Sequence, residues 1–185
     1  MDYGESSYRR FLDGDPDALC DLIAEYRTGL TYYLVGIVHS EDVAEELVEE
    51  TFFRLCYKKP SYRRIAGFKT WLYTVGRNLA LDHLRRRKRL SALPIDEFDG
   101  LADAAPTPDE ALIADERRRQ VLAAMEQLTP RYRQILWLAY FEGFSTEEMA
   151  AILKESRHNV ASVLYRAKAA LKQELLREGF SYEDQ

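Results

Sequence analysis

Aromatic and basic side chains alternate in one stretch of the sequence, between residues 61 and 89. Tyr62, Trp71 and Tyr73 are interleaved with lysines and arginines, and the stretch ends in the run Arg85-Arg86-Arg87-Lys88-Arg89. Cationic groups neutralise nucleic-acid phosphates, and exposed rings stack on unpaired bases. The basic run alone is equally consistent with a solvated helix end, and the register of Trp71 also suits a core residue. Tyr62 and Tyr73 are therefore the candidates for stacking on single-stranded nucleic acid.

Residue types used in catalysis are present, but they form no pattern that predicts an active site. His39, His83 and His158 lie in separate predicted elements. The sequence contains no glycine-rich phosphate loop, no GxSxG and no HExxH motif. We therefore expect neither an enzyme nor a bound metal or cofactor.

The cysteines and the apolar stretches predict the cellular compartment. Cys20 and Cys56 form no CxxC pair, which argues against a zinc site or a disulfide framework and fits a reducing environment. No apolar stretch is long enough to cross a bilayer, and the N-terminus lacks the apolar centre of a signal peptide. We expect a cytoplasmic protein without membrane insertion.

Charge is strongly segregated along the chain, although the formal net charge is only −5. Residues 1–53 carry 13 acidic and 3 basic side chains, whereas residues 54–90 carry 12 basic side chains and 1 acidic one. Residues 91–115 carry 7 acidic side chains and no lysine or arginine. A basic block of this kind can bind phosphate even in an acidic protein.

The acidic segment also divides the chain. It contains three prolines and a glycine and shows no sustained hydrophobic periodicity as far as Pro108. All strong patterns on either side of it are helical. We expect an all-α protein with two small helical domains, residues 1–90 and 109–185, joined by a flexible acidic linker over residues 91–108.

Three helices are predicted after residue 15 in the first domain. Asp15-Pro16 is typical of a helix start, and the apolar face that follows extends to Ile37. Ser40 caps the next helix, and a third begins at Phe68 and continues into the basic run. Carboxylates crowd the outer surface of the second helix: Asp42, Glu45, Glu46, Glu49 and Glu50. They are consistent with a solvated face or with a docking surface for a basic partner.

The second domain has the layout of a helix-turn-helix. A helix that begins at Thr129-Pro130 ends near Gly143. Ser145-Thr146-Glu147-Glu148 is a capping box before a short helix, and Lys154-Glu155-Ser156 forms a tight connection. A longer helix over residues 157–177 follows, with one apolar and one polar face.

Three segments resemble, in this order, successive signatures of the extracytoplasmic-function sigma factors of bacterial RNA polymerase. They are EDVAEELVEETFFRL, GFKTWLYTVGRNLALDHLRRRKR and LTPRYRQILWLAYFEGFSTEEMAAILKESRHNVASVLYRAKAALKQEL. Their order, with an acidic linker between the second and third, is highly specific. The resemblance implies sigma region 2 in the first domain, region 4 in the last, and a non-enzymatic initiation subunit that gives core polymerase its promoter choice.

The resemblance also implies partners and sites. The acidic helix would dock on the clamp helices of the largest polymerase subunit, region 4 would reach the flap region, and an anti-sigma factor would hold the free protein inactive. The loop at 60–67 and the helix from Phe68 would open and read the −10 promoter element. Residues implied for this role are Tyr62, Arg63, Arg64, Lys69, Tyr73, Arg77, Asn78, Asp82, Arg85 and Arg86. Residues implied for reading the −35 element are Arg157, His158, Asn159, Ser162, Tyr165 and Arg166.

The last helix departs from the family pattern. Ala161 and Val163 stand where basic residues are frequent, and the turn lacks the usual glycine. These departures keep open a sigma-like polymerase adaptor that reads promoters weakly. A second alternative is a helix-turn-helix repressor or activator that works without polymerase, which would not need the acidic helix or the aromatic loop.

Overall fold

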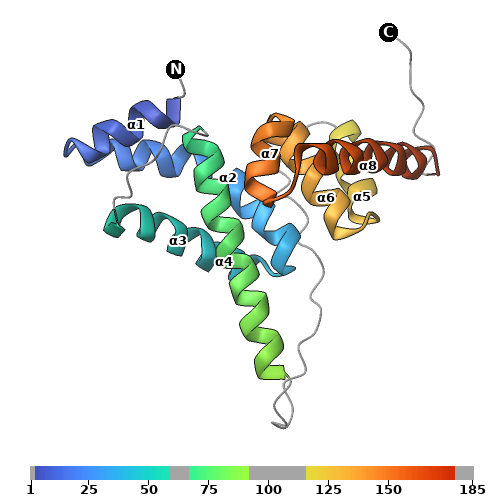
Figure 1. Cartoon of the computed structure of the whole chain (residues 1–185), viewed down its shortest axis with the longest axis horizontal. Coiled ribbons are helices and arrows are strands. Elements are labelled where there is room, and N and C mark those ends of the chain that lie inside the picture. Colours follow the sequence, from blue (N-terminus) through green and yellow to red (C-terminus); the bar gives the residue numbers. More distant parts are fainter. Residues whose placement is uncertain (1–2, 59–66, 92–115, 178–185) are drawn as a thin grey trace.

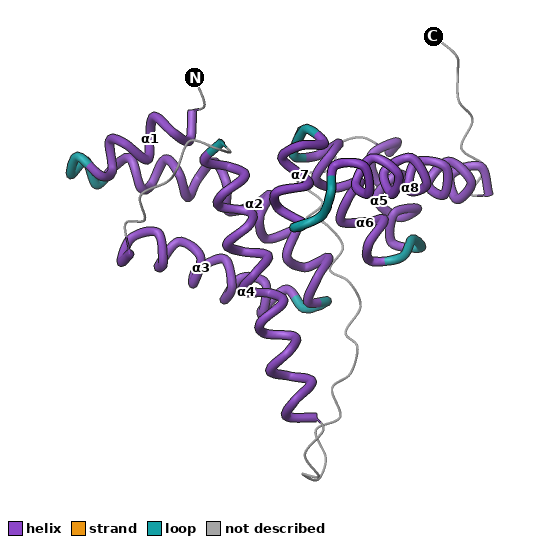
Figure 2. The backbone as a smooth tube through the Cα atoms, viewed as in Figure 1, coloured by secondary structure: helices purple, strands orange, loops and turns teal. Residues whose placement is uncertain are grey.

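The computed structural model describes residues 3–58, 67–91 and 116–177, and all regular structure within these ranges is helical (Figures 1 and 2). The N-terminal half contains α1 (Tyr3–Leu12), α2 (Asp17–Val38), α3 (Glu41–Lys58) and α4 (Phe68–Ser91). The C-terminal half contains α5 (Glu116–Glu126), α6 (Pro130–Leu136), the π-helical turn η2 (Trp137–Phe141), α7 (Thr146–Leu153) and α8 (Arg157–Arg177). The expected all-α class is confirmed, whereas residues 92–108 of the expected linker lie outside the described residues.

The central helix of the N-terminal half is α2, against which α1, α3 and α4 all pack. It starts close to the predicted position, but its first residue is Asp17, and Pro16 is its N-cap rather than its first helical residue. A carboxylate oxygen of Asp15 accepts a hydrogen bond from the backbone N–H of Asp17 at 3.0 Å. The guanidinium of Arg10 reaches the carboxylates of Asp15 at 2.6 Å and Asp21 at 3.1 Å. These ion pairs tie α1 to the start of α2.

Helix α1 is a feature that the sequence patterns did not predict. Its segment offers few apolar residues, but Tyr8 is fully buried. The Tyr8 ring lies 5.1 Å from the ring of Phe68 and 6.4 Å from that of Trp71, centroid to centroid. Trp71 is half-buried, in agreement with the core interpretation of its register. The position of α1 therefore depends on rings about sixty residues later in the chain.

The C-terminal half contains the predicted helix-turn-helix. Ser145 caps α7 in a complete capping box with Glu148, as predicted. Lys154, in the left-handed conformation (φ 56°), ends α7 where the family pattern favours glycine. The helix that begins at Pro130 differs from expectation, because its last turn, Trp137–Phe141, is π-helical before Gly143 (φ 68°) reverses the chain.

The two halves pack directly on each other and share one hydrophobic core. The main contacts place α4 against α7 and α2 against α6 (Figure 1). The C-terminal half of α4 projects away from both bundles, and residues 85–90 are all exposed (Figure 1). Nothing in the sequence pattern predicts this packing. Within the described ranges, none of the helices is long and apolar enough to span a membrane.

Candidate functional site

The expected carboxylates all lie on the outer side of α3. Ala44, Val48, Phe52 and Leu55 bury the inner side. Asp42, Glu46 and Glu49 are exposed and follow one another at helical spacing, and we call these three residues the acidic face. The other two carboxylates have partners, because Glu45 lies 3.7 Å from Arg27 and Glu50 lies 2.7 Å from Arg54.

Two exposed aromatic rings continue the acidic face, and the sequence analysis missed them. Phe53 is 62% exposed and Tyr57 is 79% exposed. Their rings stack with centroids 5.9 Å apart and an interplanar angle of 7°. The signal was present in the sequence, since positions 42, 46, 49, 53 and 57 share one side of a 3.6-residue helix. We call the acidic face together with Phe53 and Tyr57 the stripe on α3. It combines negative charge with apolar area, as protein-binding surfaces do.

The residues expected to read nucleic acid on α4 do not share one face. Lys69, Tyr73 and Arg77 lie on the side that packs inward, whereas Asn78, Asp82 and Arg85 lie on the other side. Asp82 and Arg85 form an exposed ion pair at 2.9 Å, and Arg86 is also exposed. Tyr62, Arg63 and Arg64 lie outside the described residues.

The expectation that Tyr73 is an exposed stacking residue is wrong in this structure. Tyr73 is 0% exposed and packs between the ring of Tyr33, 5.5 Å away, and the ring of Phe144, 5.1 Å away. Burial and the negative charge of Glu142 raise the pKa of the Tyr73 phenol far above its usual range. The Tyr73 ring belongs to the core because the C-terminal half covers this side of α4. The local sequence pattern could not predict that contact.

Arg77 is half-buried, and its Nε is fully buried without a hydrogen-bond acceptor among the described residues. Its guanidinium faces the buried Tyr33 phenol, whose pKa is raised by desolvation and lowered in part by the Arg77 charge. Part of the Arg77 side chain is therefore buried inside the protein and cannot contact DNA in this structure. Asn78, the next residue, lies on the other side of α4 with Asp82 and Arg85, and it is half-buried whereas those two are exposed.

The polar face of α8 is exposed along its length. His158, Ser162, Tyr165 and Arg166 are exposed, and Tyr165 reaches 77%. The two remaining expected residues have partners on neighbouring elements: the Asn159 amide donates to Glu155 at 2.7 Å, and Arg157 pairs with Glu147 at 2.8 Å.

Val163 corrects one inference from the family pattern. It is 2% exposed and packs in the core, so its position on α8 is not one that could contact bases. Only Ala161, which is exposed, remains as a departure on the polar face. The polar face of α8 therefore lacks one expected basic residue, at Ala161, and not two.

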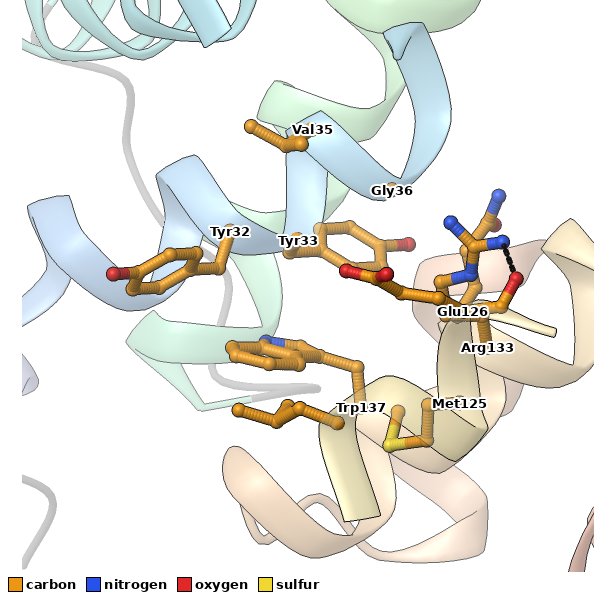
Figure 3. A pocket seen from close by; sticks show the side chains of 10 residues that line it. Tyr32, Tyr33, Val35, Gly36, Met125, Glu126, Arg133 and Trp137 are labelled. Carbon is orange, nitrogen blue, oxygen red and sulfur yellow. Dashed lines mark hydrogen bonds between the residues drawn. The ribbon is translucent and has the colours of Figure 1, made fainter. Parts of the chain in front are cut away.

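A cavity of about 70 Å³ lies between α2 and the helices α5 and α6 (Figure 3). Tyr32 and Gly36 line it from one half, and Met125, Arg133 and Trp137 line it from the other. Its volume is about half that of an engineered cavity of about 150 Å³ that holds benzene. Among the described residues, no cluster of three or more histidine, cysteine or carboxylate side chains could bind a metal.

Two family models match the chain: Sigma-70 region 2 over residues 22–90, and Sigma-70, region 4 over residues 118–171. RNA polymerase sigma factor CarQ of Myxococcus xanthus is 33% identical, over 77% of this chain and 80% of CarQ. RNA polymerase sigma-H factor of Pseudomonas aeruginosa is 30% identical, over 89% of this chain and 91% of that protein. ECF RNA polymerase sigma factor SigX of Bacillus subtilis is 28% identical, over 83% and 82%.

Two solved structures share the fold. CnrH, in complex with the cytosolic domain of CnrY, has a TM-score of 0.63 and 21% identity, with 97% of this chain and 100% of that chain covered. The sigma factor RpoE of Bartonella quintana, in complex with the anti-sigma factor NepR, has a TM-score of 0.63 and 24% identity, with 84% and 96% covered. The helical architecture is therefore common to all three chains.

Proposed function

Because this chain belongs to the extracytoplasmic-function sigma factors of RNA polymerase, which direct promoter-specific transcription initiation, we propose a role for each of its exposed surfaces. The acidic face of α3 binds core polymerase, the outer side of α4 binds the −10 element, and the polar face of α8 reads the −35 element. One observation carries these assignments: each helix buries one side, and α3 and α8 leave most of their expected residues exposed, as α4 does for Asp82, Arg85 and Arg86.

The composition of the stripe on α3 supports polymerase docking. Carboxylates accelerate and orient association with a basic partner, and buried aromatic rings supply most of the affinity in many interfaces. Phe53 and Tyr57 would lose their exposed area only in a complex. We assign the clamp helices of the largest polymerase subunit as the partner of this stripe, and the flap region as the partner of the C-terminal half.

The projecting end of α4 supports a contact with opened promoter DNA. Its cations, from Arg85 to Arg89, are all exposed, whereas the C-terminal half covers the start of the helix. Cations in this setting bind phosphates without regard to sequence, so sequence reading falls to side chains such as Asn78. Tyr62, Arg63 and Arg64 in the preceding loop keep their predicted role in this proposal.

Helix α8 is suited to the major groove of duplex DNA. A helix of this kind inserts the side chains near its N-terminus against base edges, and α8 presents His158, Ser162 and Arg166 there. The burial of Val163 weakens the alternative of an adaptor that reads promoters weakly, since Val163 is one of the departures that favoured it.

The protein works without catalysis, in the cytoplasm, and under the control of an anti-sigma factor. The partner is supported by two structures that share this fold, CnrH in complex with the cytosolic domain of CnrY and RpoE in complex with the anti-sigma factor NepR. Copurification from the native host at low salt tests for such a partner. A clean monomer that initiates transcription unaided would contradict it.

Promoter opening by the reconstituted holoenzyme tests the assignment of α4. Asn78→Ala should lower permanganate reactivity of the opened strand while duplex promoter binding stays near wild type, because the amide contacts bases only after melting. Gln127→Ala, which removes an exposed amide from the C-terminal half, is the control. Unchanged opening with Asn78→Ala would remove Asn78 from the proposed −10 contact.

A further inference from the structure

The side chain of Asn159, on the first turn of α8, is held by a carboxylate from the connection between α7 and α8. Its amide nitrogen donates a hydrogen bond to Oε2 of Glu155 at 2.7 Å. The same oxygen accepts a hydrogen bond from the guanidinium of Arg131, at the start of α6, at 2.8 Å. One oxygen of Glu155 therefore links α6 to the helix that we propose for the major groove.

The backbone on both sides of this link is also fixed. The N–H of Glu155 donates a hydrogen bond to the carbonyl of Ala150 at 3.1 Å, which closes the end of α7. The hydroxyl of Ser156 accepts a hydrogen bond from the N–H of Asn159 at 3.2 Å and so caps α8. The Glu155 side chain is 25% exposed. Because the donor and the acceptor are both anchored, the Asn159 amide is held in one orientation.

Elementary chemistry assigns the two ends of this amide. An ionised carboxylate only accepts hydrogen bonds, so the group of Asn159 that lies against Glu155 is the NH2 and not the carbonyl. The carbonyl Oδ1 of Asn159 accepts no hydrogen bond from any residue that the structure describes. Oδ1 and the second N–H of the amide are therefore left for a partner outside the chain.

Asn159 lies on the side of α8 that the proposed function uses. Asn159, Ser162 and Arg166 are spaced three and four residues apart, so they share one side of the helix. Ser162 and Arg166 are exposed, and Asn159 is half-buried beside Glu155. In a docked helix-turn-helix, the first residues of the second helix contact base edges. The free edge of the Asn159 amide is therefore available to a base of the −35 element.

We propose that Glu155 is a positioning residue that makes Asn159 select adenine at one position of the −35 element. In the major groove, only adenine offers an amino donor beside a ring-nitrogen acceptor, and this pair matches the carbonyl and the second N–H of the amide. Guanine offers two acceptors, thymine one acceptor and cytosine one donor. The inference rests on the proposed −35 role of α8, to which it adds the base that is read and the carboxylate that fixes the reading.

The experiment measures the affinity of reconstituted holoenzyme for a set of promoter duplexes that carry each of the four base pairs at every −35 position in turn. Asn159→Ala removes the amide, Glu155→Ala frees it, and Glu155→Gln keeps an acceptor oxygen for it. Glu174→Ala, which breaks an ion pair with Arg177 at the far end of α8, is the control. Thermal melting checks that each variant folds.

We expect wild type to favour adenine at one position by about tenfold, the scale of a bidentate base contact. Asn159→Ala should remove this preference at that position alone. Glu155→Ala should lower it to about threefold, half of the discrimination on a free-energy scale, because a freed amide can also turn its NH2 toward guanine or thymine. Glu155→Gln and Glu174→Ala should keep the wild-type preference.

Three results would overturn the proposal. The first is an unchanged preference in folded Glu155→Ala, since the carboxylate would then not fix the reading. The second is an equal loss of affinity for every duplex in Asn159→Ala, which would make Asn159 a phosphate contact. The third is a preference for guanine at the position that depends on Asn159, which would contradict the assignment of Oδ1.

The same measurements distinguish a failure of this inference from a failure of the proposed function. If wild-type holoenzyme shows no base preference at any −35 position, α8 does not read the element, and the proposed role of α8 fails together with the inference. If wild type has preferences and none of them changes in Asn159→Ala, α8 reads the element through other side chains, and the inference alone fails.

Discussion

The ammonium of Lys69 lies 2.9 Å from the carboxylate of Glu142, which is 73 residues later in the chain. This ion pair joins the start of α4 to the turn before the helix-turn-helix. The C-terminal half covers the first part of α4 at this ion pair, whereas the last part of α4 projects into solvent.

Charge reversal on the acidic face should remove polymerase binding. We expect Glu46→Lys with Glu49→Lys to weaken core binding by about a hundredfold, because like charges set against a basic partner cost several kcal/mol. Equilibrium binding to purified core polymerase measures the effect, and thermal melting should show a folded protein. Asp13→Lys with Glu25→Lys, which makes the same charge change elsewhere on the N-terminal half, is the control. Equal affinity of the two double variants would show that the docking assignment is wrong.

The exposed aromatic pair should matter for affinity and not for stability. Phe53→Ala and Tyr57→Ala should each change the free energy of unfolding by less than about 0.5 kcal/mol, since both rings are in solvent. Each should weaken core binding by about 2 kcal/mol if the ring becomes a buried anchor. Leu12→Ala, which removes an exposed apolar side chain from α1, is the control. A loss of stability without a loss of affinity would make the pair a structural feature.

Arg166 should discriminate promoters. Arg166→Ala is expected to weaken binding to a −35 duplex by roughly 1–3 kcal/mol and to leave a scrambled duplex nearly unaffected, if the guanidinium makes a bidentate contact with a base. Band-shift titrations of holoenzyme measure both affinities. Arg177→Ala removes an exposed arginine from the far end of α8 as the charge-matched control. Equal losses on both duplexes would reduce Arg166 to a phosphate contact.

The contact between the halves should weaken in mild acid. Desolvation, followed by the charge of Arg133 in the opposite half, lowers the pKa of His39 below its ordinary value of 6.5, although the residue is exposed. A lowered histidine pKa means that the closed form binds fewer protons, so its stability falls as the pH drops through about 6.5. Energy transfer between fluorescent labels on Cys20 and on Gln173→Cys, two exposed positions in a Cys56→Ser background, should therefore decrease from about pH 7.5 to about pH 5.5. His39→Asn, which tolerates the left-handed conformation at φ 57°, should flatten this dependence. A variant with the wild-type pH profile would exclude His39 as the cause.

Local patterns predicted the elements that local physics controls. The capping box at Ser145 is as predicted, and α2 starts at Asp17, close to the predicted Asp15, because each feature depends on hydrogen bonds within a few residues. The exposed carboxylates of α3 follow equally from helical periodicity. For the same reason, the polar face of α8 could be predicted from the sequence.

Features that depend on distant residues could not be predicted in this way. Tyr73 alternates with basic residues as an exposed stacking residue does, but Phe144 in the other half covers its ring. Helix α1 forms where Tyr8 meets Phe68, and the π-helical turn places Trp137 against Glu142. These contacts join segments that a periodicity argument treats separately. Phe53 and Tyr57 are different, because their place on the exposed side of α3 follows from helical spacing alone.

Run-off transcription of genomic fragments with core polymerase, followed by sequencing of the RNA 5′ ends, tests most directly that this chain directs promoter-specific initiation. We expect new 5′ ends that appear only when the chain is added, share one pair of upstream elements, and disappear with Glu46→Lys and Glu49→Lys. The absence of new 5′ ends, or their persistence with that double variant, would contradict the account.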